Sequence, residues 1–173
     1  DSRWITYSKN LPSHLRAIFI YSVADKKANQ ITDGLADAVF PPFDAGGKYL
    51  YFLASTNFGP STSWLEMSSL DRPVRRAIYL AVLGANEPSP LLPELGDEPP
   101  RPPESAAPAK PPAPAPVTVQ IDFNGIAQRI LAIGVAAGDY SNPSAGAAGS
   151  FYYTEPITPA PGSPLRLQRY QLK

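Results

Sequence analysis

The sequence predicts an all-β fold: a partial β-propeller of about two to three four-stranded antiparallel blades with a disordered Pro-rich insert. The clearest unit is a tight turn at residues 44–47 followed by a strand-like run at 48–54. Weaker copies of this unit place Trp4 against Tyr49, 45 residues apart, and Phe151 against Tyr49. Units that return after roughly 40–50 residues are typical of propeller blades.

Individual strands are expected wherever β-branched and aromatic residues gather between turn residues. A hairpin turn at 24–29 should lead into a short outer strand at 30–34, and the Asn124-Gly125 dipeptide predicts a tight turn. Residues 117–123 begin with alternating apolar and polar residues. The run at 48–54 has almost no polar residue, so we expect that strand to be covered on both faces. The principal expected strands are residues 4–8, 17–23, 48–54, 77–83, 130–135, 150–155 and 165–173.

A long loop interrupts the second copy. Residues 16–21 align with residues 76–81 at an offset of 60, so about 15 extra residues fall within 56–75. Long loops in compact β domains are often functional. One interpretation is a loop that contacts a peptide or a neighbouring domain, and the other is a loop that buries its own aromatic residues against the blade rim. The candidate contact residues are Trp64, Arg72, Arg75 and Arg76, with Phe58 and Met67 in the same loop.

The composition divides the chain into three parts: blades at residues 1–87, a Pro/Ala-rich segment at 88–116, and further blade sequence at 117–173. Twelve of the 22 prolines lie in the middle segment. Because proline supplies no backbone donor and this composition offers little apolar surface, we expect a disordered linker. A docking motif for a proline-reading partner is the alternative.

The charge balance and the residue inventory exclude several classes of function. Fifteen basic residues balance 15 acidic ones, so no basic field attracts nucleic acid, and no apolar run is long enough to span a membrane. There is no cysteine, and His14 is the single histidine, so we expect no metal site and no cofactor. Asp33, Asp37 and Asp44 do not have the spacing of a calcium loop. No Gly-x-Ser-x-Gly motif is present, so no catalytic residue is assigned, and a non-catalytic role is favoured.

Several segments together resemble bacterial tricorn-like serine peptidases. They are residues 46–55, the loop reaching residues 71–74, residues 76–80 and 88–91, and above all residues 121–130 (IDFNGIAQRI). The resemblance covers propeller sequence only and includes TolB-like and WD40-like blade repeats. It implies a segment that gates or guides peptide substrates and scaffolds assembly, with the chemistry carried out elsewhere in the parent protein. The alternative is an independent TolB-like module that binds a peptide, a glycan or an envelope protein.

The expected partners follow from this resemblance: peptide substrates, neighbouring domains of the parent peptidase or a second copy of the chain. The first copy starts at Asp1 without a preceding turn, and the strand at 165–173 stops before one. We therefore expect an excerpt of a longer protein whose end blades expose apolar faces, so that the chain alone is an oligomer or a poorly behaved monomer. A periplasmic or secreted bacterial location is favoured over the cytoplasm.

Overall fold

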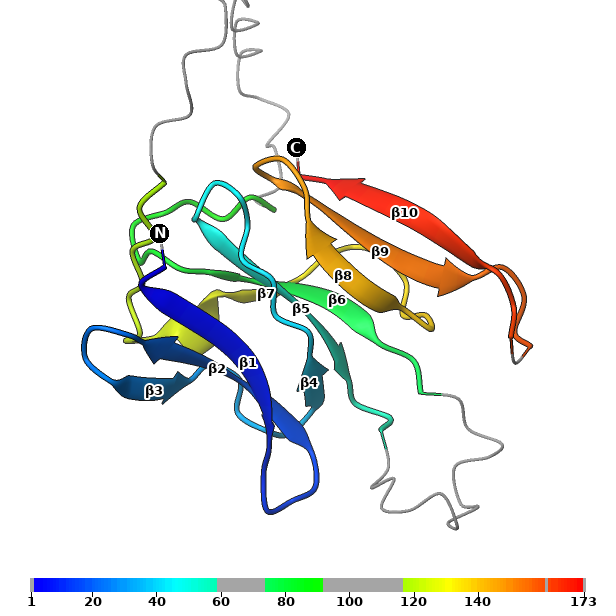
Figure 1. Ribbon diagram of the computed structural model, residues 1–173, viewed down its shortest axis with the longest axis horizontal. Helices are drawn as coiled ribbons and strands as arrows, with labels where there is room; N and C mark the ends of the chain where they lie inside the picture. Colours follow the sequence, from blue (N-terminus) through cyan, green and yellow to red (C-terminus); the bar gives the residue numbers. More distant parts are fainter. Residues whose placement is uncertain (1, 59–73, 92–116, 161, 173) are drawn as a thin grey trace, which may run out of the picture.

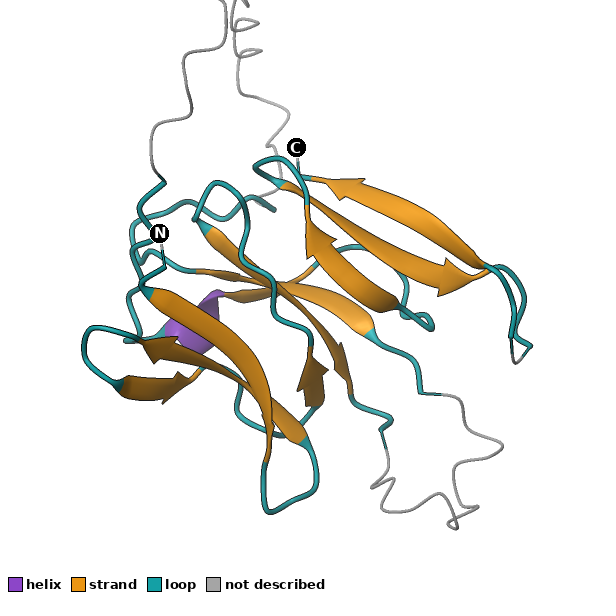
Figure 2. Ribbon diagram, in the orientation of Figure 1, coloured by secondary structure: helices purple, strands orange, loops and turns teal. Residues whose placement is uncertain are grey.

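The computed structural model describes residues 2–58, 74–91, 117–160 and 162–172, and it confirms an antiparallel all-β fold (Figure 1). Three sheets lie in succession along the chain. The first contains β1 (Trp4–Asn10), β2 (Arg16–Ser22) and β3 (Lys27–Gln30); the second β4 (Asp37–Val39), β5 (Tyr49–Ser55), β6 (Ala77–Val82) and β7 (Ile130–Ala132); the third β8 (Ser141–Ala145), β9 (Ser150–Pro156) and β10 (Leu165–Gln171). The one helical element in the described residues is a 3-10 turn, η1 (Ile126–Arg129), and none of these residues forms a helix that could cross a membrane (Figure 2).

The repeated unit found in the sequence occupies the same place in each sheet. β1, β5 and β9 each pair antiparallel with the next long strand, β2, β6 and β10 respectively. Trp4 and Tyr49 are the first residues of β1 and β5, and Phe151 is the second residue of β9. The turn before β5 closes with Gly47 at a φ of 72°, a conformation that favours glycine. The three sheets are thus successive blades that do not close into a ring.

The short strand expected at residues 30–34 and the alternating run at 117–123 differ in the structure from what their patterns indicated. β3 begins at Lys27 rather than at residue 30, because the hairpin turn before it is shorter than its polar composition suggested. Residues 117–123 form no strand: the carbonyl of Val119 accepts side-chain hydrogen bonds from Arg3 and Trp4 at 3.2 Å each, and the Asp122 amide donates to Leu83 at 2.9 Å. This segment is therefore held against the first two sheets without joining a ladder.

The second sheet is buried on both faces, as the apolar run at 48–54 predicted. Side chains alternate along β5, so Leu50 and Phe52 enter the core shared with the first sheet, while Tyr51 and Leu53 enter the core shared with the third. Tyr51 stacks on Phe151 of β9 with ring centroids 4.8 Å apart. Sheet-on-sheet packing of this kind is what holds adjacent blades together.

The outer faces of the first and third sheets are only partly covered. Ile5 of β1 is 54% exposed, next to a stacked pair formed by Tyr7 and Phe19. Leu165 and Leu167 of β10 are 54% and 65% exposed. These are the apolar faces that a neighbouring blade would cover in a closed propeller.

β7 pairs with β6 although a long segment of sequence separates them. The chain after residue 116 therefore returns first to the second sheet and only then builds the third. Arg129 fixes this return, because its guanidinium donates to the Val82 carbonyl at 3.1 Å. The division at residues 88 and 116 stays a prediction, because residues 92–116 lie outside the described part of the chain.

Candidate functional site

A buried carboxylate joins the first two sheets at the end where β5 stops and β6 starts, which we call the long-loop end (residues 11–15, 56–58 and 74–76). Asp37, the first residue of β4, has no exposed side-chain surface. The guanidinium of Arg16, the first residue of β2, donates to both carboxylate oxygens, with distances of 2.8 Å from Nε and 2.6 Å from Nη2. The Arg16 amide also donates to the carboxylate at 3.1 Å. Such a bidentate, charge-assisted pair is among the stronger polar contacts in proteins.

A second arginine shares the same carboxylate. Nη2 of Arg76, the residue before β6, lies 3.6 Å from the Asp37 carboxylate, and the Arg76 Nε is buried without a hydrogen-bond partner among the described residues. The backbone of Arg76 is held by two hydrogen bonds with Gly138, 2.8 and 3.0 Å long. Two guanidinium groups therefore share one carboxylate, which leaves one excess positive charge within this group of three side chains. Arg16 is the firmly bound member, and its hydrogen bond to Asp37 raises the pKa of the Arg16 guanidinium above its ordinary value.

The surroundings of this cluster are partly aromatic and partly exposed. The Arg16 guanidinium lies 5.4 Å from the centre of the Phe58 ring. Arg75 is exposed, and its amide donates to Asn57 at 3.3 Å, which draws the two sides of the long loop together. Among the residues that the structure describes at this end, basic side chains thus outnumber acidic ones, and one aromatic ring lies beside them.

The structure describes two of the four candidate contact residues proposed from the sequence. Arg75 and Arg76 are both at the long-loop end, and Arg76 contacts Asp37. Trp64 and Arg72 lie outside the described residues. Arg16 and its bond to Asp37 were missed, although an arginine stands at the same place in the two aligned segments, Arg16-Ala-Ile and Arg76-Ala-Ile.

The other residues considered from sequence have structural positions. His14 is exposed in the β1–β2 connection, and its amide donates to the Leu11 carbonyl at 2.9 Å. Asp44 is buried and accepts hydrogen bonds from the amides of Gly46 and Gly149, each at 2.8 Å. Asp44 therefore ties the turn before β5 to the turn before β9, across the second and third sheets. Within the described ranges, no group of three His, Asp or Glu residues could hold a metal ion.

The comparisons with known proteins agree with this architecture. No protein-family model matches the chain. The chain is 28% identical over 162 residues to Tricorn protease homolog 1 of Streptomyces coelicolor. The aligned region covers 91% of this chain and 14% of that protein. The crystal structure of the tricorn protease matches with a TM-score of 0.63 and 19% identity, covering 99% of this chain and 16% of the matched chain.

These matches confirm the resemblance to a tricorn-like propeller region and the partial-propeller fold. The matches cover only part of these proteins: this chain spans 14% of the length of the homologue and 16% of the chain in the crystal structure.

Proposed function

We propose that this chain is a non-catalytic propeller segment of a tricorn-like serine peptidase, which guides or gates peptide substrates and scaffolds the assembly. The observation that carries the proposal is the excess positive charge among the described residues of the long-loop end, in a chain similar to a tricorn protease homologue. The chemical step would be carried out by other parts of the longer protein.

The long-loop end suits the carboxylates of an extended peptide. Arginine guanidinium groups bind carboxylates through paired N–H donors. Arg16 is bound to Asp37 through two such donors, whereas Arg76 makes only the longer 3.6 Å contact and has a partly exposed side chain. Arg75 extends the basic surface into solvent. The Gly138 pairing fixes the backbone of Arg76, so no main-chain ordering is needed here when a ligand binds.

The absence of catalysis in this chain is also a proposal. A serine triad needs a histidine that contacts both a nucleophile and a carboxylate. The one hydrogen bond that His14 makes within the described residues is through its backbone amide. Its exposed place in a short turn suits a solvated loop residue.

The scaffolding role rests on the two outer faces. Ile5 on the first sheet, and Leu165 and Leu167 on the third, leave apolar surface open at both ends of the row of blades. Neighbouring blades of the longer protein, or another copy of the chain, would cover these faces.

Binding of an acidic peptide tests the guiding role. The probe is a fluorescein-labelled, unstructured peptide rich in Asp and Glu and free of Lys, followed by fluorescence anisotropy. Arg76→Met should weaken binding by about tenfold to a hundredfold, because a hydrogen bond to a charged group contributes about 1.5–3 kcal/mol. Lys27→Met is the matched control, since it removes one exposed positive charge at the opposite end of the blades.

Two outcomes would contradict the proposal. One is that the unaltered chain does not bind the peptide at low ionic strength. The other is that Arg76→Met binds as tightly as the control variant.

A further inference from the structure

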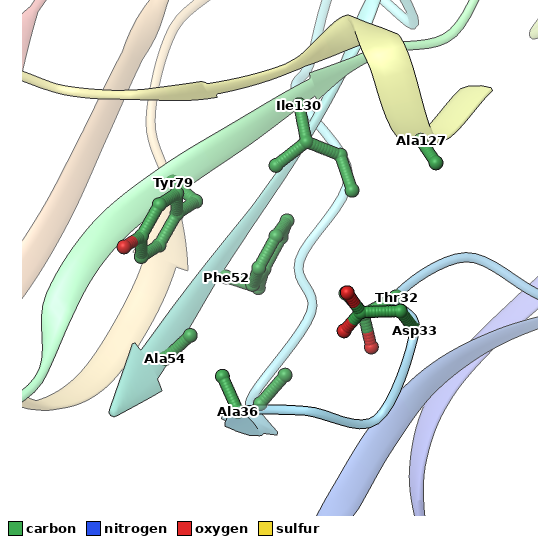
Figure 3. Close-up of a pocket in the computed structure, with 9 residues that line it drawn as sticks. Thr32, Asp33, Ala36, Phe52, Ala54, Tyr79, Ala127 and Ile130 are labelled. Atoms are coloured by element: carbon green, nitrogen blue, oxygen red, sulfur yellow. The ribbon is translucent and has the colours of Figure 1, made fainter. Parts of the chain in front are cut away.

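An open cavity lies between the first and second sheets and is separate from the arginine cluster. Its volume is about 270 Å³, and its floor is made of small side chains (Figure 3). Ala36 and Ala38 reach it from the start of β4 and Ala54 from the end of β5. Larger residues at these three positions would fill the space between the blades, so the cavity is a direct consequence of the alanines.

An aromatic pair forms one wall of this cavity. Phe52 of β5 and Tyr79 of β6 are stacked with ring centroids 5.6 Å apart and an interplanar angle of 14°. Figure 3 shows Phe52 between Tyr79 and the segment that carries Thr32 and Asp33, so one face of the Phe52 ring is toward the cavity. An aromatic face of this kind attracts cations as well as apolar groups.

The opposite wall carries one carboxylate with spare hydrogen-bonding capacity. Asp33 Oδ1 accepts a hydrogen bond from the Leu35 amide at 2.9 Å, while no cation within the described residues pairs with Asp33. The neighbouring Thr32 hydroxyl already accepts from the Ile18 amide at 3.0 Å. Asp33 Oδ2 therefore remains available as an acceptor on this wall. Neither Arg16 nor Arg76 lines the cavity.

We propose that this cavity binds the alkylammonium side chain of a lysine in a peptide. The aliphatic stem would lie on the alanines and Phe52, and the ammonium would meet Asp33 Oδ2. The compact ammonium of lysine, on an unbranched four-carbon stem, suits a cavity of about 270 Å³ that has a single carboxylate in its wall. The inference rests on the proposed function in one respect: the lysine side chain would be presented by a peptide.

A small probe tests the cavity without a peptide. The probe is N-acetyl-lysine N-methylamide, titrated into the isotope-labelled chain and followed by the NMR shifts of the Ala36 and Ala54 methyl groups. The uncharged N-acetyl-norleucine N-methylamide has the same stem, so it should bind at least fivefold more weakly. Asp33→Asn should weaken lysine-probe binding by a similar factor, because the amide can still accept from Leu35 but carries no charge.

The control variant is Asp139→Asn, which removes another exposed carboxylate that does not line the cavity and should leave the affinity unchanged. Equal binding of the two probes, or lysine-probe binding that Asp33→Asn leaves intact, would overturn the proposal. So would the absence of shifts at Ala36 and Ala54 in the unaltered chain. Because the acidic peptide used at the long-loop end contains no lysine, failure of this test leaves that result standing, and the reverse also holds.

Discussion

The arginine cluster at the long-loop end allows stability and ligand binding to be separated by three substitutions. Asp37→Asn removes the charge that two guanidinium groups share, Arg16→Met removes the bidentate partner, and Arg76→Met removes the more distant one. If Arg76 serves a ligand rather than the fold, its loss should cost far less than the loss of Asp37 or Arg16.

The expected magnitudes follow from the contacts. Removing one partner of a fully buried ion pair costs roughly 3–5 kcal/mol. The side chains of Arg16 and Arg76 are 31% and 16% exposed, so we expect about 2–3 kcal/mol for Asp37→Asn. Arg16→Met loses two charge-assisted bonds, but Arg76 can approach the carboxylate, so about 1.5–2.5 kcal/mol is expected. Arg76→Met should cost less than about 1 kcal/mol, because it breaks a 3.6 Å contact and also removes a buried, unpaired Nε.

Urea unfolding followed by circular dichroism measures these differences, provided that the slope of the free energy of unfolding against urea stays unchanged. The expected order of destabilisation is Asp37→Asn, then Arg16→Met, then Arg76→Met. A cost for Arg76→Met equal to that of Arg16→Met would make Arg76 a structural residue and refute the reasoning. A neutral Asp37→Asn would show that the carboxylate is not buried between the arginines.

Three further outcomes are expected. Burial and the Asp44 carboxylate raise the pKa of Tyr51 above its unfolded value near 10, so the stability that neutral Tyr51 contributes is complete below about pH 10 and is lost as the pH rises further. Tyr51→Phe should therefore reduce the loss of unfolding free energy at alkaline pH, measured by urea unfolding. An unchanged pH profile in this variant would contradict the prediction. Leu167→Lys should reduce self-association in light scattering across about a hundredfold dilution, whereas Leu35→Lys, at an 81% exposed loop position, should not; a monomeric unaltered chain throughout would refute this. Replacing residues 92–116 with a Gly/Ser linker of equal length should change the free energy of unfolding by less than about 1 kcal/mol, and a larger loss would show that the segment packs.

The repeat could be predicted because its signals are short-range. A turn that needs Gly47 at positive φ and a following apolar strand are both local features, so the copies at Trp4, Tyr49 and Phe151 could be aligned without knowledge of the fold. The burial of β5 on both faces followed from its composition in the same way.

The short edge strands β4 and β8 could not be predicted. β4 has three residues, which is too few to show an alternating pattern. β8 has the sequence Ser-Asn-Pro-Ser-Ala, which is typical of a turn, and proline is tolerated there because β8 is an edge strand. Both strands are defined by the neighbours they pair with, and that information is not local.

The candidate sites show the same division. The loop length pointed to Arg75 and Arg76, but Asp37 was considered only as a member of an acidic group with Asp33 and Asp44. In the structure the three carboxylates have separate surroundings: a pair of arginines at Asp37, an open cavity at Asp33 and two turn amides at Asp44. Each of these environments is built by residues from more than one sheet, so spacing along the chain gave no indication of them.

The central claim is that this propeller segment receives peptides at the long-loop end without cleaving them. An NMR titration of the isotope-labelled chain with the acidic peptide tests it directly, with the peptide mass measured before and after. We expect shift changes concentrated at Asn57, Phe58, Arg75 and Arg76, and a peptide of unchanged mass. Shift changes confined to the opposite end of the blades, around Lys48 and Glu87, or peptide fragments whose formation His14→Ala abolishes, would contradict the account.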